Sequence, residues 1–330
     1  MILQLPTRNI DMNKPLKLLK IPYGIAGIQS IRSDGYAYVD KTRFIENLEN
    51  SDVRFAALTR PERFGKSLFA QTLWAYYDLD AASRFESTFS GTFIGSRKSR
   101  LAGRLHALQF NFAGLSSYRP EEDFLITVRN SLHTFFQTYP HPRQQDILHG
   151  SHPDAGALIE AFFQILGSEY RQKVFVIIDD YDHLLNKSLH GEVDEARTSA
   201  YAAIFLDFFQ KLRCACSDSG PVAKIFVTGE SSAALSSMKA GAFINPLDSP
   251  AYATMSGFTE TELRELIPAI IDIDAYGHSV DDIIAGIKER CPSLCLSADA
   301  RDTVFNPSVC LFYLGYIKDE NEEPVKHLKA

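Results

Sequence analysis

Cysteine, tryptophan and long apolar runs are scarce in this chain of 330 residues. The cysteines form no paired C-x-x-C framework, and the nine histidines supply no cluster at metal-ligand spacing. A disulfide scaffold and a zinc site are therefore both disfavoured. We expect reduced thiols, as in a reducing compartment, at Cys214, Cys216, Cys291, Cys295 and Cys310.

A segment able to enter a membrane is also missing from the sequence. No apolar run approaches the roughly 18 residues that span a bilayer. Residues 1–15 alternate polar and apolar side chains and lack the basic region and apolar core of a secretory signal. The sequence therefore predicts a cytoplasmic protein with no membrane partner.

An excess of positive charge is absent as well. Lys and Arg number 34 against 41 Asp and Glu, and the resulting net charge of −7 gives no support to indiscriminate nucleic-acid binding. A basic stretch at residues 97–100, with Arg104 nearby, is either a solvated loop or a local nucleic-acid contact. The 45% of hydrophobic residues are typical of an ordinary globular protein.

Strands and helices are predicted to alternate as far as residue 228. Short apolar runs rich in strand formers alternate with stretches of helical apolar spacing. This pattern predicts right-handed βαβ units, and hence an α/β fold whose parallel sheet carries helices on both faces. The expected strands are 53–59, 105–112, 173–180 and 223–228, and the expected helices are 68–77, 121–138, 154–166 and 195–216.

The strand signals fade after about Met255. Thr259 and Glu262 form a capping box that opens a helix, and Ser279 caps another helix over residues 280–290. We therefore expect a small C-terminal helical domain. The predicted organisation is a lead-in at 1–21, a core at 22–252, the helical domain at 253–318 and a charged tail at 319–330.

The segment between the first strand and the first helix resembles a phosphate-binding P-loop, or Walker A motif. The consensus is G-x-x-x-x-G-K-[ST], and the chain reads Arg-Pro-Glu-Arg-Phe-Gly-Lys-Ser from residue 60. Gly65 lets the backbone approach a phosphate, Lys66 supplies a positive charge, and Ser67 offers a hydroxyl to Mg²⁺. The helix that follows would aim its first N–H groups at the anion.

Arg60 stands where the consensus has glycine, so the start of this loop must differ from the standard one. Arg60 and Arg63 either add positive charge at the phosphates or are solvated loop arginines. The position of the Gly-Lys-Ser tripeptide between a strand and a helix favours an ATP phosphate site. The residues expected to bind the nucleotide are Arg60, Pro61, Glu62, Arg63, Phe64, Gly65, Lys66, Ser67 and Leu68.

Two acids, Asp179 and Asp180, end the apolar run at residues 174–178. The segment resembles a Walker B strand, in which Asp179 would hold Mg²⁺ and Asp180 would orient or deprotonate the attacking water. Ligands bind at the carboxyl ends of parallel strands, which favours these roles over ordinary acids at a helix start. Asp is one methylene shorter than the Glu that is usual in the second position, so ATP binding is better supported than fast hydrolysis.

Thr228 ends the next expected strand, and Glu230 follows it closely. A polar residue at Thr228 can hydrogen-bond the γ-phosphate or the water, although ordinary loop polarity is the alternative for both residues. The candidate catalytic residues are therefore Lys66, Asp180 and Thr228. The candidate metal ligands are Ser67 and Asp179.

Several segments, in this order, resemble the prokaryotic family of predicted AAA-ATPase-like proteins over about residues 22–313. They are the lead-in at 22–25 and 36–42, the P-loop at 60–67, the Walker B segment at 178–182, the sensor strand at 227–229, the start of a helical lid at 257–262 and a last motif at 305–308.

The resemblance implies an ASCE-type P-loop NTPase core, a small helical or winged-helix-like lid, and ATP with Mg²⁺. It assigns roles in the ATP site to Lys66, Ser67, Asp179 and Thr228. Tyr181 and Asp182 would either support that site or pack and cap the start of a helix. Family members often carry a C-terminal nuclease-like domain of the PD-(D/E)XK class, but no such constellation follows the helical domain, so nuclease activity is not expected.

Two departures from the family pattern affect the expected activity. Asp180 stands where a Glu is expected, and Glu62 stands where a basic residue is common. Two functions therefore stay open: a Mg²⁺-dependent ATP hydrolase that drives conformational change, and a nucleotide-binding regulatory module with little turnover. An inactive structural remnant is disfavoured by the intact Gly65-Lys66-Ser67. A protein partner and a homo-oligomer both stay open, whereas nucleic acid has only the basic stretch in its favour.

Overall fold

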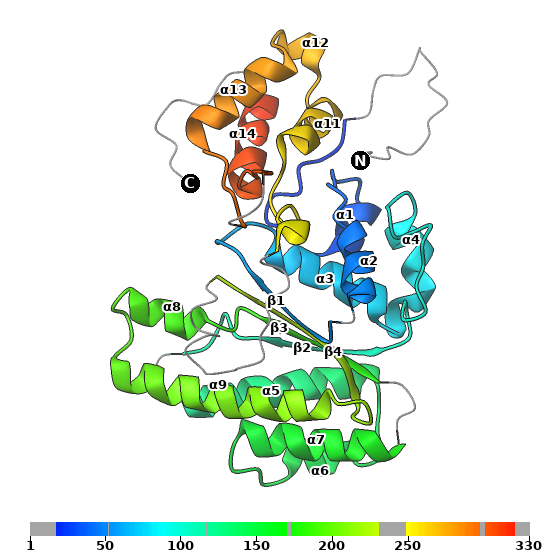
Figure 1. Cartoon of the computed structure of the whole chain (residues 1–330), viewed down its shortest axis with the longest axis vertical. Coiled ribbons are helices and arrows are strands. Elements are labelled where there is room, and N and C mark those ends of the chain that lie inside the picture. Colours follow the sequence, from blue (N-terminus) through cyan, green and yellow to red (C-terminus); the bar gives the residue numbers. More distant parts are fainter. Residues whose placement is uncertain are drawn as a thin grey trace.

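The computed structural model describes residues 18–51, 53–116, 118–169, 173–230, 249–297 and 301–320. Helices cover both faces of a central parallel sheet, and a further group of helices lies beyond one end of it (Figure 1). Most of the expected lead-in and tail, at 1–17 and 321–330, lies outside the described residues.

The sheet has four parallel strands in the order β1-β4-β3-β2. They are β1 (Phe55–Thr59), β2 (His106–Asn111), β3 (Val174–Asp179) and β4 (Val222–Gly229). In the pairing register Leu58 lies beside Thr228, and Ile178 lies beside Val227. The strand before the expected P-loop and the strand with the expected acids therefore both flank β4, and their carboxyl ends share one edge of the sheet.

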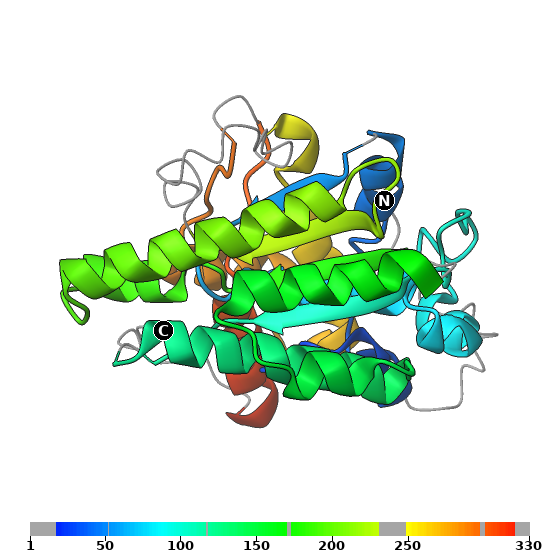
Figure 2. The ribbon, with the colours of Figure 1, turned by 90° about the horizontal axis from the view of Figure 1, so that it is seen from below.

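Two sets of helices cover the sheet. On one face lie α1 (Ile28–Ser33), α2 (Arg43–Asn50), α3 (Lys66–Tyr77), the 3₁₀ turn η1 (Asp80–Arg84) and α4 (Phe85–Phe89). The other face carries α5 (Pro120–Thr138), α6 (Gln144–His149), α7 (Ala155–Glu169), α8 (His183–Leu189) and α9 (Glu195–Ala215). The view from below shows α5, α7 and α9 lying side by side over the sheet (Figure 2).

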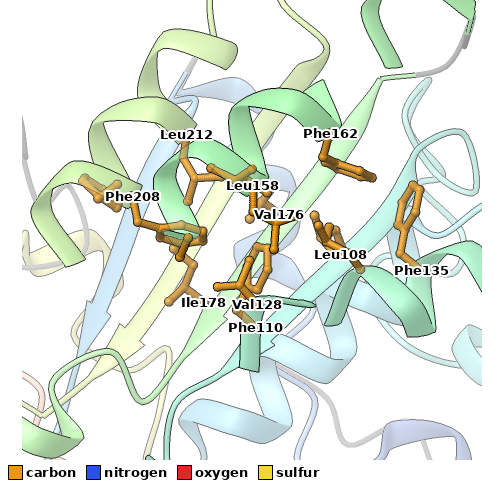
Figure 3. Close-up of a cluster of buried hydrophobic side chains, with 14 of the residues drawn as sticks. Leu108, Phe110, Val128, Phe135, Leu158, Phe162, Val176, Ile178, Phe208 and Leu212 are labelled. Carbon is orange, nitrogen blue, oxygen red and sulfur yellow. The ribbon is translucent and has the colours of Figure 1, made fainter. Parts of the chain in front are cut away.

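Each face of the sheet has its own apolar core. All six residues of β3 are buried, as expected for a central strand covered on both faces. Val176 and Ile178 point towards α5, α7 and α9, where they meet Leu158, Phe208 and Leu212 (Figure 3). Phe175 and Ile177, which alternate with them, belong to the core under α3.

A third core belongs to the C-terminal helices, called here the helical cluster: α11 (Glu260–Ile270), α12 (Ile273–Tyr276), α13 (Val280–Arg290) and α14 (Pro307–Glu320). The capping box expected at Thr259 is present, and the expected cap Ser279 forms a capping box as well, with Asp282. The N-terminal segment joins this core through Ala37 and Val39. The division into domains at residue 252 stays a prediction, because the segments before and after it share one apolar cluster.

A buried ion pair links the N-terminal segment to α11. The Lys41 ammonium donates to both carboxylate oxygens of Glu262, at 2.6 and 2.7 Å, and to the carbonyl oxygen of Thr254 at 2.8 Å. Glu262 also accepts the N–H of Thr259 at 2.8 Å, so one carboxylate serves both the ion pair and the capping box.

The alternating pattern predicted from the sequence is confirmed, and the long elements lie within about three residues of their expected bounds. Short helices, among them α1, α4 and α12, were not predicted, because four to six residues carry too little periodicity. Among the helices of the described residues, none combines the length and the apolar character that crossing a membrane requires.

Candidate functional site

The loop between β1 and α3 makes a sharp turn through two left-handed residues. Gly65 is the N-cap of α3 with φ 86°, a conformation that costs glycine little because it has no Cβ. Arg63 has φ 62°, which is uncommon for a residue with a side chain. The turn brings the N-terminal end of α3, whose first N–H groups have no intrahelical acceptor, to the sheet edge.

Lys66 folds back over its own loop. Its ammonium donates to the carbonyl oxygens of Arg60 at 3.0 Å and Pro61 at 3.1 Å, and the residue is 6% exposed. A buried ammonium beside a helix N-terminus makes this end of α3 strongly positive, as a site for an anion requires.

Residues of the C-terminal part hold the outer side of the loop. The N–H of Gly257 donates to the carbonyl oxygen of Phe64 at 3.1 Å, and the Asn306 amide donates to that of Glu62 at 3.4 Å. Because these carbonyls are engaged on the outside, the loop is tied directly to the segments that open and close the helical cluster.

The Arg60 side chain is neither a solvated loop arginine nor a charge directed at the phosphates, the two environments expected from the sequence. It is 2% exposed, and its guanidinium donates to the carbonyl oxygens of Thr59 at 2.8 Å and Tyr252 at 3.3 Å. The Arg60 N–H also donates to Gly229 at 3.1 Å. The guanidinium thus anchors the loop to the start of the C-terminal part, whereas Arg63 lines the cavity described below.

Three expected site residues from different strands and helices converge at the sheet edge. The Thr228 hydroxyl donates to Oδ1 of Asp179, and the Ser67 hydroxyl lies 3.4 Å from the same oxygen. Asp179 is 2% exposed and Thr228 is fully buried. The adjacent carboxyl ends of β3 and β4 account for this meeting, since Asp179 and Thr228 each lie one residue beyond the Ile178–Val227 pair.

Asp180 lies just beyond β3 with a left-handed backbone, φ 54°. Its N–H donates to the Thr228 hydroxyl at 3.3 Å. Burial and the neighbouring Asp179 carboxylate raise the pKa of Asp180 to about 6, although the positive charge of Lys66 opposes the shift. A carboxyl with a raised pKa in a cleft is a recognised mark of a functional site.

A cavity of about 620 Å³ lies beside these groups, a size suited to a small-molecule ligand. Its polar lining residues include Gly65, Lys66, Ser67, Asp180 and Glu230, and because Glu230 interacts electrostatically with Lys66 and Asp180, this part is called here the polar end. Among its apolar lining residues, which include Ile25, the side chains of Val39, Phe258, Leu266 and Leu311 belong to or pack against the core of the helical cluster and form the other, mainly apolar end. Its walls therefore come from the P-loop, the N-terminal segment and the helical cluster.

Two wall residues had no assigned role in the sequence analysis. Lys41, within the 36–42 motif, lines the cavity and donates a hydrogen bond to Glu262. Tyr23 also lines the cavity, with 53% of its surface exposed. Residues 22–41 carry no phosphate-binding motif. Their place in the cavity wall follows from how this segment packs on the helical cluster, which the sequence does not show.

The oxygen atoms at the sheet edge suit a hard cation. A hydroxyl and a carboxylate, Ser67 and Asp179, share one small space, and Mg²⁺ commonly takes few protein ligands and completes its shell with water and phosphate oxygens. Within the described residues no group of three or more His, Cys, Asp or Glu side chains could hold a metal ion.

The basic stretch at residues 97–100 has partners within the fold. The Arg97 guanidinium lies 4.4 Å from the Phe93 ring and 3.8 Å from the Glu46 carboxylate. The Lys98 ammonium lies 4.2 Å from the Phe85 ring. These contacts favour a structural role for both cations over a nucleic-acid contact.

Comparison with known proteins identifies a family. The model of the family described as "Predicted AAA-ATPase" matches residues 22–239. A search of curated proteins found no match.

Two solved structures of the Aeropyrum pernix ORC2 protein are similar in part. The structure of its ADPNP–ADP complexes is 14% identical with a TM-score of 0.34, covering 78% of this chain and 53% of that one. The ADP form is 13% identical with a TM-score of 0.39, covering 92% and 65%. This chain spans about half to two thirds of the length of that protein.

Proposed function

This chain belongs to the predicted AAA-ATPase family and has the α/β fold of the P-loop ATPase class; within that class we propose that it binds ATP with Mg²⁺ and hydrolyses it. The observation that carries the proposal is that Lys66 and Ser67 line the cavity while Ser67, Asp179 and Thr228 meet directly beside it.

In the proposed complex the phosphates lie over the N-terminal end of α3. The N–H groups of the first turn and the Lys66 ammonium would bind the β- and γ-phosphate oxygens. Lys66 must then leave the carbonyl oxygens of Arg60 and Pro61, both about 3 Å away, so the loop holds the ammonium in place until the anion arrives.

Ser67 and Asp179 are the proposed metal ligands. Bound Mg²⁺ would neutralise charge on the phosphate oxygens and polarise the γ-phosphate for attack. The Thr228 hydroxyl donates to Asp179 and so fixes the carboxylate orientation. The Asp180 N–H donates to the same hydroxyl, so Thr228 also links the proposed metal ligand to the residue proposed to act on the attacking water.

The mainly apolar end of the cavity is the proposed site for the nucleoside. Ile25 and Val39 come from the N-terminal segment, and Leu266 and Leu311 come from α11 and α14. A base held between these two parts would favour their closed arrangement, because bound ligand stabilises the state that contacts it best. We therefore propose that the helical cluster is a lid that closes on bound nucleotide. A protein partner or a second copy in the cytoplasm would bind differently to the open and the closed lid.

The alternative is a nucleotide-binding module that turns over little ATP. Asp180 favours it, since its side chain is shorter than Glu and its left-handed backbone fixes the direction in which that chain leaves the strand.

Measurements of ATP binding and phosphate release, with and without Mg²⁺, test the proposal. Lys66→Ala should weaken ATP binding about tenfold or more, since a hydrogen bond from a charged group contributes about 1.5–3 kcal/mol. Lys211→Ala is the matched control, because Lys211 is a surface residue of α9 paired with Glu160. Asp180→Asn should keep binding and lower turnover.

The outcomes separate the two functions. Mg²⁺-dependent binding without turnover in the wild-type protein would leave only the regulatory module. Absence of ATP binding would refute both functions. Turnover that Lys66→Ala does not change would locate the activity elsewhere.

A further inference from the structure

Glu230 lies at the polar end of the cavity although no motif of the sequence assigns it a role. It directly follows Gly229, the last residue of β4, and so comes from the strand next to the one that ends in Asp179. Its N–H donates to Oδ2 of Asp182 at 2.8 Å. Asp182 is 1% exposed, so a buried carboxylate fixes the backbone from which the Glu230 side chain leaves.

Tight packing at Gly229 also fixes the direction of the chain. A Cβ at Gly229 would lie 2.3 Å from the Tyr181 ring, so the end of β4 can approach β3 only because this residue has no side chain. Tyr181 is itself held, since the Tyr201 hydroxyl donates to its carbonyl oxygen at 2.6 Å. Glu230 therefore starts from a rigid point of the scaffold.

The charges around Glu230 are those of the phosphate end of the cavity. Burial raises the pKa of its carboxyl, the Lys66 ammonium lowers it, and the carboxylates of Glu62, Asp182 and Asp180 raise it further. The Glu230 carboxyl thus lies within electrostatic range of both the P-loop lysine and Asp180. Lys66, Asp180 and Glu230 line the same end of the same cavity.

Asp180 alone has limited reach towards a γ-phosphate. Its backbone is fixed by the hydrogen bond of its N–H to Thr228, and its side chain has one methylene fewer than Glu. A longer carboxylate side chain that directly follows the neighbouring strand β4 can make up for this shortfall, because β3 and β4 end side by side. General bases act only when their oxygen comes within hydrogen-bond distance of the water.

We propose that Glu230 is a catalytic residue that accepts the proton of the attacking water, while Asp180 orients that water. The proposal rests on the ATP hydrolysis proposed above. The water oxygen bonds to the γ-phosphorus, the bond from that phosphorus to the bridging oxygen breaks with its electron pair left on ADP, and the water proton passes to the Glu230 carboxylate. That carboxyl then releases the proton to solvent.

The test is the Glu230→Gln variant, which keeps the shape of the side chain and removes its basicity. Phosphate release should fall about 100-fold or more, the range lost with a general base, while affinity for a non-hydrolysable ATP analogue stays within about twofold. Calorimetric titration with ADP, Mg²⁺ and aluminium fluoride, which mimics the transition state, should show about tenfold weaker binding. Glu121→Gln, an exposed position on α5, is the matched control.

A second variant tests reach. Glu230→Asp keeps the charge and shortens the side chain, so it should lie between wild type and Glu230→Gln in turnover. Wild-type turnover in Glu230→Gln, or equal loss of affinity for both nucleotide analogues, would overturn the role of Glu230 and leave ATP hydrolysis standing. A wild-type protein that binds ATP without turnover would overturn the catalytic role, and one that does not bind would overturn the proposed function as well.

Discussion

Breaking the ion pair between Lys41 and Glu262 should destabilise the protein far more than breaking a surface pair. The Lys41 side chain is 11% exposed and that of Glu262 2%. All three ammonium hydrogens have an acceptor within 2.8 Å. Burial lowers the pKa of the Lys41 ammonium and the Glu262 carboxylate opposes the shift, so the charge depends on its partner.

Lys41→Met removes the cation and leaves a buried carboxylate whose remaining donor is the Thr259 N–H. An uncompensated buried charge costs about 3–5 kcal/mol. Glu262→Gln leaves the ammonium without a counter-charge, and the double variant should recover part of either loss. A coupling free energy of about 1–3 kcal/mol is therefore expected from the double-mutant cycle.

Urea unfolding followed by circular dichroism measures these free energies. Lys211→Met is the matched control, since Lys211 and Glu160 lie 2.8 Å apart but are 36% and 50% exposed. This surface pair should contribute little to stability, because solvent screens it. Losses below about 1 kcal/mol for both single variants of the buried pair, with additive effects, would refute the reasoning. A separate early transition would mean that the helical cluster unfolds by itself.

Three further predictions concern the sheet and its edge. Burial lowers the pKa of His106 below its usual 6.5. Below that pH the unfolded chain therefore binds more protons than the folded one, and stability is lost as pH falls. His106→Phe should make the free energy of unfolding, measured with urea, less dependent on pH in this acidic range. Gly229→Ala should cost about 1–3 kcal/mol in urea unfolding through its clash with Tyr181, whereas Gly114→Ala, with nothing within 4 Å, should be nearly neutral. Thr228→Val should weaken Mg²⁺-dependent ATP binding about tenfold in titration calorimetry, because a hydrogen bond to the charged carboxylate contributes about 1.5–3 kcal/mol; unchanged affinity would remove Thr228 from the site.

The long elements were predictable because each one carries its own periodic signal. The helix expected at 121–138 is α5, Pro120–Thr138, and the buried strand expected at 173–180 is β3, Val174–Asp179. An unbroken apolar run such as that of β3 predicts, from composition alone, a strand that is buried on both faces of the sheet. Short helices such as α1 have no such signal, and tertiary packing rather than local propensity stabilises them.

The phosphate-loop and acidic-strand residues were also predictable as a set, because a P-loop has a fixed spacing and acids at strand ends are visible in the chain. Their meeting depends on strand order, however. Asp179 and Thr228 meet because β3 and β4 are neighbours in the sheet, and Ser67 reaches them because β1 lies on the other side of β4.

By itself the sequence determined the alternating fold, the loop at residues 60–67 and the identity of the strand-end acids. Only the tertiary structure decided that Arg60 anchors the loop through backbone carbonyls, that residues 22–41 form a wall of the cavity, and that Glu230 lies beside Asp180 at its polar end. The physical reason is the distance along the chain over which each interaction acts. Periodicity, capping and motif spacing act within one element, whereas burial, ion pairing and cavity shape depend on segments as far apart as Lys41 and Glu262.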